Sequence, residues 1–245
     1  MKDWFAHWFD TEYYHALYRH RDEQEAFYFL EKLVNWLQLP RGKALDVCCG
    51  RGRHSLSLHQ LGFEVLGIDL SQNNITHAES LSKKGLHFLC GDMRYHLPAE
   101  TFDLSVNLFT SFGYFDRVSD DLLALESMLE SLNENGLLLI DFLNRDYILK
   151  TLDNKSIQHT RAGNWEFTWQ RELQGDRICK KISVIDGETV LHYTELVRLY
   201  SYSDFIEMAR TCKAQIVHIF GNYDLEPFEA QHSERLILCM RRSMP

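Results

Sequence analysis

Several features are scarce in this chain of 245 residues, and proline is the scarcest, with 4 in all. No segment is dominated by glycine, serine or proline, and hydrophobic residues make up 45% of the chain. This composition excludes fibrous and disordered proteins. The length suits one α/β domain with room for an insertion.

The 6 cysteines lack the spacing of a metal site. No CxxC pair occurs, no histidine pair stands at a matching distance, and Cys48 and Cys49 are adjacent. Most of the cysteines lie in apolar, strand-like runs, where a free thiol packs as a small hydrophobic group. We therefore expect no bound metal and no disulfide framework, and a reducing compartment.

A long hydrophobic run is also missing. The apolar run 137–140, with Phe142 and Leu143 after it, is far shorter than the roughly 20 residues that cross a bilayer. The segment 1–5 contains an early acid and does not resemble a secretory signal. The expectation is a cytoplasmic protein that does not contact a membrane.

Positive charge is in deficit, with 26 basic residues against 35 acidic ones and a net charge of −9. The basic residues form no long block. Nucleic-acid affinity depends on neutralising phosphates, so this balance favours a small-molecule partner over DNA or RNA.

Apolar patterns typical of helices and strands alternate over the first part of the chain. A helical stripe covers residues 22–37, and strand-like segments cover 43–48, 63–68, 86–90, 102–108 and 137–142. Helices are expected between them, one capped by Ser71 and another over 120–132. Such alternation predicts a parallel sheet covered by helices on both faces.

After Asn144 the apolar period changes to two, as in Trp165, Phe167 and Trp169, and turns are indicated at 175–176 and 186–187. We predict an inserted antiparallel β subdomain over residues 146–200. A helix near 202–212 and strands at 215–220 and 235–241 then return the chain to the main domain, which would comprise residues 1–145 and 201–245.

The strongest chemical signal is the segment 44–54, in which Asp46 near a strand's end precedes Gly50 and Gly52. Two glycines one residue apart before a helix make a tight turn where a ligand can approach the backbone. A dinucleotide-binding turn would need a third glycine where Ser55 stands and would not ordinarily have Asp46 before it. This disfavours NAD and FAD.

Two further acids follow successive strands. Asp69 ends the second strand, a position suited to binding both hydroxyls of a ribose. Asp92 follows the third strand, where its carboxylate is placed to accept a hydrogen bond from an adenine amino group. Because successive parallel strands end at one edge of a sheet, we expect Asp46, Asp69 and Asp92 to surround one adenosine-like ligand.

These motifs resemble those of the class I S-adenosylmethionine-dependent methyltransferases. Residues 46–52 resemble the family's glycine-rich first motif, with Cys48 where a glycine is usual; Asp69, followed by Leu70, resembles its ribose-binding acid, and 91–93 its adenine-flanking motif. The resemblance implies a Rossmann-like, doubly wound, seven-stranded sheet whose last strand is antiparallel. It also implies S-adenosylmethionine as cofactor and S-adenosylhomocysteine as product, with the following cofactor-binding residues in these motifs: Asp46, Cys48, Gly50, Gly52, Asp69, Leu70, Gly91, Asp92 and Met93.

Two other segments are similar to those of a bacterial subgroup that acts on small molecules. In the segment 107–115, Asn107 and Phe109 are implied to line the methionine end of the cofactor. In 13–21, which is similar to a lid, Arg21 is implied to pair with the methionine carboxylate, and Tyr14 and Tyr18 to lie near the sulfonium.

The expected activity is methyl transfer to a small-molecule acceptor, by a monomer or a homodimer. Two alternatives stay open: an RNA or protein methyltransferase, and a non-catalytic protein that binds S-adenosylmethionine or S-adenosylhomocysteine. In-line displacement at a sulfonium requires no covalent nucleophile and no metal. As general base, His54, His192, Tyr114 and Tyr223 are candidates only if they face the pocket, and no catalytic residue is assigned.

Overall fold

The computed structural model describes residues 4–95, 97–99 and 101–243. Its main sheet has seven strands in the order β10-β11-β5-β4-β1-β2-β3. Their bounds are β1 Lys43–Val47, β2 Glu64–Asp69, β3 Leu86–Cys90, β4 Phe102–Asn107, β5 Leu132–Leu143, β10 Ala214–Phe220 and β11 Arg235–Arg242. β1 to β5 are parallel, and β11 runs antiparallel to both of its neighbours. The predicted sheet with an antiparallel last strand is confirmed.

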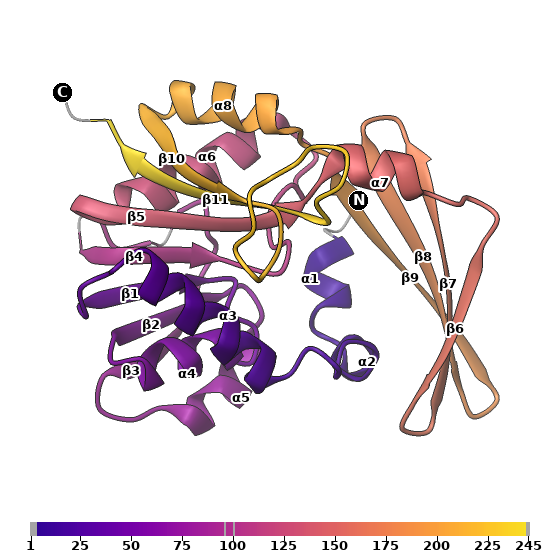
Figure 1. Cartoon of the computed structure of the whole chain (residues 1–245). Helices are drawn as coiled ribbons and strands as arrows, with labels where there is room; N and C mark the ends of the chain where they lie inside the picture. Colours follow the sequence, from indigo (N-terminus) through magenta and orange to yellow (C-terminus); the bar gives the residue numbers. More distant parts are fainter. Residues whose placement is uncertain (1–3, 96, 100, 244–245) are drawn as a thin grey trace.

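Helices cover both faces of this sheet (Figure 1). On one face, α3 (Glu23–Trp36) and α4 (Arg53–Gln60) pack in one apolar cluster with β1, β2 and β4. On the other face, α6 (Val118–Glu130) and α8 (Tyr202–Thr211) pack in a second cluster. This burial follows the apolar stripe of each helix.

The helix that follows β2 begins as the sequence predicts. Ser71 caps α5 (Gln72–Ala78), and its hydroxyl accepts a hydrogen bond from the Asn74 backbone N–H at 3.0 Å. A short 3₁₀ helix, Glu79–Leu81, then leads toward β3. This cap fixes the point at which the chain leaves β2 and turns over the edge of the sheet.

A second sheet contains four antiparallel strands in the order β6-β7-β8-β9. These are β6 Ile157–Ala162, β7 Trp165–Gln174, β8 Arg177–Asp186 and β9 Thr189–Arg198. They fall within the segment predicted as an inserted antiparallel subdomain. The division of the chain into domains stays a prediction.

Two short N-terminal helices, α1 (Trp4–Trp8) and α2 (Glu12–Leu17), lie between the two sheets (Figure 1). Trp8 and Leu17 pack against Phe167 and Ile182 of the second sheet. These helices connect the beginning of the chain to a sheet formed more than half-way along it.

Some boundaries differ from the expected ones. β5 begins at Leu132 rather than at 137, because Leu132 pairs with Phe102 instead of ending α6. The apolar pattern of the sequence did not predict α1, α2, α7 (Arg145–Thr151) or β6. In β6 five of the six side chains are exposed, so its sequence carries no apolar alternation. Among the described residues, no helix is long and apolar enough to cross a membrane.

Candidate functional site

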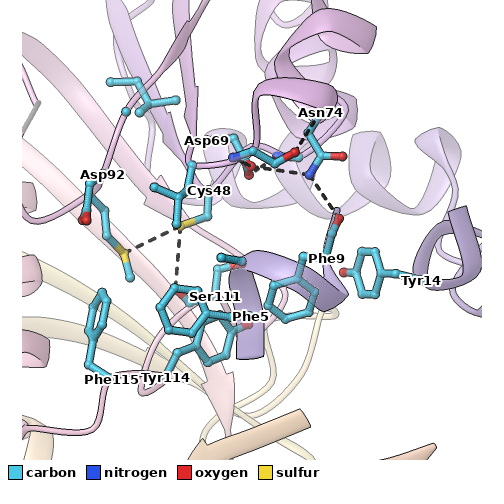
Figure 2. A pocket seen from close by; sticks show the side chains of 17 residues that line it. Phe5, Phe9, Tyr14, Cys48, Asp69, Asn74, Asp92, Ser111, Tyr114 and Phe115 are labelled. Carbon is cyan, nitrogen blue, oxygen red and sulfur yellow. Dashed lines mark hydrogen bonds between the residues drawn. The ribbon is translucent and has the colours of Figure 1, made fainter. Parts of the chain in front are cut away.

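A cavity lies beyond the carboxyl ends of β1, β2 and β3 (Figure 2). We call it the first cavity; its volume is about 100 Å³. It is lined by eight of the predicted site residues, which are Tyr14, Cys48, Gly50, Asp69, Leu70, Gly91, Asp92 and Met93. Ligands of α/β folds bind at this edge of the sheet. The structure therefore brings together segments that are distant in sequence.

Asp69 is held in place by backbone N–H groups. Its Oδ2 accepts a hydrogen bond from the Gly50 N–H at 2.9 Å, and its Oδ1 accepts one from the Ser71 N–H at 2.9 Å. Burial raises the pKa of this carboxyl, and the two N–H donors act in the opposite direction. The carboxylate is thus oriented toward the cavity with acceptor capacity left over.

The turn after β1 has a left-handed backbone at three of its residues. The φ angles are 62° at Cys48, 56° at Gly50 and 87° at Gly52. A Cβ at Gly50 would meet nothing within 4 Å, so this glycine faces open space in the cavity wall. A Cβ at Gly52 would lie 2.8 Å from the Phe88 ring, so this glycine permits close packing.

Cys48 occupies the turn position where the resemblance implies a glycine. Its side chain points toward the cavity, and its Sγ lies 3.6 Å from Met93 Sδ and 3.9 Å from the Ser111 carbonyl oxygen. The thiol thus fills space between two segments that line the cavity.

Three predicted residues lie behind the cavity wall instead of lining it. Asp46 is 1% exposed, and Ser55 donates a hydrogen bond to its Oδ2 at 2.6 Å; burial raises the pKa of this carboxyl to about 7. Asn107 is buried and donates to the carbonyl oxygens of Val47 and Ser111. Gly52 begins α4. All three support the turn and the loop from which the lining residues come.

Asp92 lines the cavity and is also ion-paired. The Arg94 guanidinium donates to its carboxylate, at 2.6 Å from Nη2 to Oδ2, and Arg94 also lies 4.4 Å from the Phe115 ring centroid. This pair fixes the orientation of Asp92 at one end of the cavity, beside Met93.

The remaining predicted residues line two adjoining cavities. A second cavity of about 360 Å³ and a third of about 180 Å³ both include Tyr14, Tyr18, Arg21 and Phe109. Tyr14 also lines the first cavity, so the three are neighbours. Arg21 lies 5.3 Å from the Phe109 ring centroid and is ion-paired with Glu25.

Comparison with known proteins agrees with this geometry. Residues 44–136 match the family model described as a methyltransferase domain. The chain is 26% identical to the putative methyltransferase YqeM of Bacillus subtilis over 226 residues, which are 87% of this chain and 90% of that protein. A solved S-adenosylmethionine-dependent methyltransferase from Clostridium acetobutylicum superposes with a TM-score of 0.79 at 21% identity, covering 95% of this chain and 97% of that one. The methyltransferase CcbJ from Streptomyces caelestis gives 0.76 at 15% identity, covering 91% and 90%.

Residues 44–136 thus form a methyltransferase domain, and the chain has the fold of solved S-adenosylmethionine-dependent methyltransferases. It is an enzyme of the methyltransferase type, and its two-sheet architecture is that of solved methyltransferases.

Several residues that line the three cavities were not predicted from the sequence as binding residues. Tyr114 was considered only as a possible base, yet it lines both the first and the second cavity. Arg53, whose guanidinium lies 4.9 Å from the Phe109 ring centroid, lines the third. Further lining residues of the first cavity are Phe5, Ala6, Phe9, Ile68, Ser71, Asn74, Ser111 and Phe115. The sequence could have indicated Asn74, because it is the third helical residue after the predicted cap Ser71 and so lies near the end of β2.

The other three candidate bases lie in different places. His54 lines the third cavity, Tyr223 donates a hydrogen bond to Asp141 Oδ2 at 2.9 Å, and His192 is bonded to Ser183 on the second sheet. None of these three lines the first cavity of the methyltransferase domain.

Proposed function

We propose that this protein transfers a methyl group from S-adenosylmethionine to a small-molecule acceptor by in-line displacement. The observation that carries the proposal is the joint exposure of the Asp69 carboxylate and the Gly50 backbone to one cavity at the carboxyl ends of β1 and β2. This arrangement suits the two hydroxyls of a ribose beside an unobstructed peptide turn.

The residues around the first cavity offer the polar and apolar groups that an adenosine would bind. Asp69 has acceptor positions left for hydroxyl donors, and the open space beside Gly50 gives a ligand access to the backbone. Leu70 and Gly91 line the same cavity as Asp92 and Met93, which provide an acidic and an apolar group for a purine. We assign the ribose to Asp69 and the adenine to the Asp92–Met93 end.

The methionine end is assigned to the third cavity. Arg21 and Arg53 both lie over the Phe109 ring, and the pair offers guanidinium groups for a carboxylate. Tyr14 and Tyr18 supply aromatic rings, which favour a neighbouring cation. We assign Arg21 the role that the resemblance implies, and we add Arg53 to it.

The sulfonium supplies an electrophilic methyl group with its leaving group already attached. The residues of this chain then have to align the acceptor and exclude water. Phe9, Tyr14 and Tyr114 line both the first and the second cavity and form the boundary across which the methyl would pass. Correct alignment contributes up to about 7–11 kcal/mol in well-oriented reactions.

The second cavity supports a small acceptor. It is lined by residues of α1 and α2, the main sheet and the second sheet, and its volume of about 360 Å³ lies within the range of small-molecule sites. A relative that is 32% identical over 98 residues, 40% of each chain, is an N,N-dimethyltransferase of a dTDP-linked amino sugar from Streptomyces venezuelae. That protein's acceptor is a small molecule.

Thermal unfolding with and without S-adenosylhomocysteine tests the cofactor site. At 100 times its dissociation constant the product adds about 2.7 kcal/mol to the stability of a protein that binds it only when folded. We expect Asp69→Ala to lose most of this shift. Glu64→Ala, at the exposed opposite end of the same strand, should retain it.

Turnover is tested by incubating the protein with S-adenosylmethionine and a pool of small metabolites, and by searching for a methylated product together with S-adenosylhomocysteine. A product is expected. If the protein binds S-adenosylhomocysteine and forms no product from a broad pool, the proposed catalysis is wrong and a cofactor-binding role replaces it. Equal shifts for Asp69→Ala and Glu64→Ala would refute the ribose assignment.

A further inference from the structure

The second cavity has a row of charged side chains along one wall. Arg171 of β7 is paired in register with Lys180 of β8, and Lys180 is paired with Glu195 of β9. All three line this cavity. Two positive residues thus lie directly opposite each other on the face that the second sheet turns toward the methyltransferase domain.

Such a pair is costly to the fold. Like charges opposite each other on neighbouring strands are destabilising. Lys180 is only 6% exposed, and burial lowers its pKa while Glu195 acts in the opposite direction. Arg171 also opposes the charge on Lys180. The sheet therefore keeps a second cation beside the buried Lys180, at an exposed position on the cavity face.

Lys180 has partners within the protein. Its Nζ donates a hydrogen bond to the Tyr18 hydroxyl at 2.6 Å and lies 3.9 Å from Glu195 Oε2. Glu195 also accepts hydrogen bonds from Trp8 Nε1 at 2.8 Å and from the Tyr18 hydroxyl at 2.9 Å. The negative charge in the row is therefore already engaged by Lys180 and by two further donors.

Arg171 differs from the other arginines of the cavity. Arg235 is ion-paired with Asp141 at 2.7 Å, and Arg21 is paired with Glu25. No ion pair or side-chain hydrogen bond links Arg171 to any other residue within the described ranges 4–95, 97–99 and 101–243. Its guanidinium thus retains a full set of donors at the wall of the cavity.

Aromatic side chains lie beside this positive wall. Lys180 Nζ lies 5.0 Å from the Trp169 ring centroid and 4.7 Å from that of Tyr18. Trp169 and Arg171 both line the second cavity and a neighbouring cavity, which also includes Asp153. The carboxylate of Asp153 is engaged by the Lys155 backbone N–H at 2.9 Å.

We propose that the methyl acceptor carries an anionic group, a carboxylate or a phosphate, which binds the Arg171 guanidinium beside Lys180 in the second cavity. An arginine fork matches the geometry of both anions, and an anion there offsets the repulsion between the two cations. The inference rests on the proposed methyl transfer, because that activity makes the second cavity the acceptor site. The chain as a whole has a net charge of −9, so the positive charge of this wall is local to the second cavity.

The test is calorimetric titration of the full chain, saturated with S-adenosylhomocysteine, with three matched aromatic probes: benzoate, phenyl phosphate and the neutral benzamide. We expect one of the two anions to bind and benzamide to bind more weakly. The anion that binds more tightly identifies the acidic group. Arg171→Gln should weaken its binding by about tenfold or more, as for a lost hydrogen bond to a charged group.

Lys181→Gln is the matched control. Lys181 is the next residue along β8, exposed and on the opposite face of the sheet, where it pairs with Glu172. This variant should bind the anion as the wild type does. Arg171→Gln should also unfold at a temperature equal to or above that of the wild type, because it removes the cross-strand repulsion; a merely structural role for Arg171 predicts the opposite.

The outcomes separate this inference from the proposed function. If S-adenosylhomocysteine itself does not bind to the wild type, the proposed function is refuted, and the inference that rests on it is refuted as well. If S-adenosylhomocysteine binds but neither anion exceeds benzamide, the anionic acceptor is refuted and the methyltransferase proposal stands. Equal anion binding by Arg171→Gln and Lys181→Gln would also refute the assignment to Arg171.

Discussion

Asp69 Oδ2 and the backbone nitrogen of Gly50 lie 2.9 Å apart, so the last residue of β2 holds the turn that follows β1. The two residues are 19 positions apart in the chain. One hydrogen bond therefore connects the two features that define the candidate cofactor site. Changes on either side of this bond should affect ligand binding more than they affect the fold.

The two glycines of the turn should respond differently to alanine. Gly50→Ala is expected to cost about 1–2 kcal/mol of stability for its left-handed φ, and to weaken S-adenosylhomocysteine binding because the new methyl group enters the open space beside the turn. Gly52→Ala should lose more stability, because its Cβ would lie 2.8 Å from the Phe88 ring. Denaturant unfolding and calorimetric titration measure both effects. Unchanged affinity in Gly50→Ala would contradict the assignment of the turn to the ligand.

Glycine should be preferred over alanine at Cys48. Both Cys48→Gly and Cys48→Ala remove the thiol, but alanine retains a Cβ at a φ of 62°. We expect Cys48→Gly to be the more stable of the two by about 1 kcal/mol. At the buried Cys239 in β11 the order should be reversed, since glycine weakens a strand interior. Urea unfolding of the four variants measures this, and the same order at both sites would exclude backbone strain at Cys48.

The buried Asp46 should make stability depend on pH. Burial raises its pKa to about 7 in the folded chain from a value near 3.8. The folded state therefore binds a proton more tightly than the unfolded state, and this contribution is fully present below about pH 4 and lost as the pH rises toward 7. Asp46→Asn, which keeps an oxygen to accept the Ser55 hydrogen bond, should remove it.

The measurement is the difference in unfolding free energy between wild type and Asp46→Asn from pH 4 to pH 8. This difference cancels the other groups that titrate in the same range, such as Asp121, whose pKa burial raises to about 6. The unfolding free energy of Asp46→Asn should increase relative to that of the wild type as the pH rises through this window. A difference independent of pH would show that Asp46 is ionised in the folded protein throughout.

Arg235 should be essential to the loop that carries Phe109. Its Nε donates to Asp141 Oδ1 at 2.7 Å, while Asp141 Oδ2 accepts the Phe109 backbone N–H at 2.9 Å. Arg235→Met leaves a buried carboxylate without its cation, and we expect a loss of about 3–5 kcal/mol. Arg210→Met, at an exposed pair with Glu207, should cost less than about 1 kcal/mol. Chemical denaturation compares them, and similar losses would mean that Asp141 is hydrated in the folded protein.

The alternation of strands and helices in the main sheet was predictable because its signals are local, whereas the seven-stranded sheet with an antiparallel last strand was implied by the family resemblance. Strands β1 to β4 are short apolar runs, each followed by a turn or by the apolar stripe of a helix, and these patterns depend only on neighbours in sequence. The positions of Asp69 and Asp92 at the same edge followed from the parallel order of the strands. The sequence did not reveal that Asp46 and Asn107 lie behind the cavity wall, because burial of a polar side chain depends on what packs over it.

The succession of strands β1 to β5 along the chain and the acids near the carboxyl ends of β1 to β3 were therefore determined by the sequence alone, because backbone periodicity and chain connectivity fix them. The contents of the second cavity were decided by tertiary structure. Trp8 and Tyr18 bond to Glu195 across 187 and 177 positions of the chain, and Arg171 faces the cavity only because that face of the second sheet packs on the N-terminal helices. Alternation assigns side chains to two faces of a strand, but only the packing of one element against another selects the face that is enclosed.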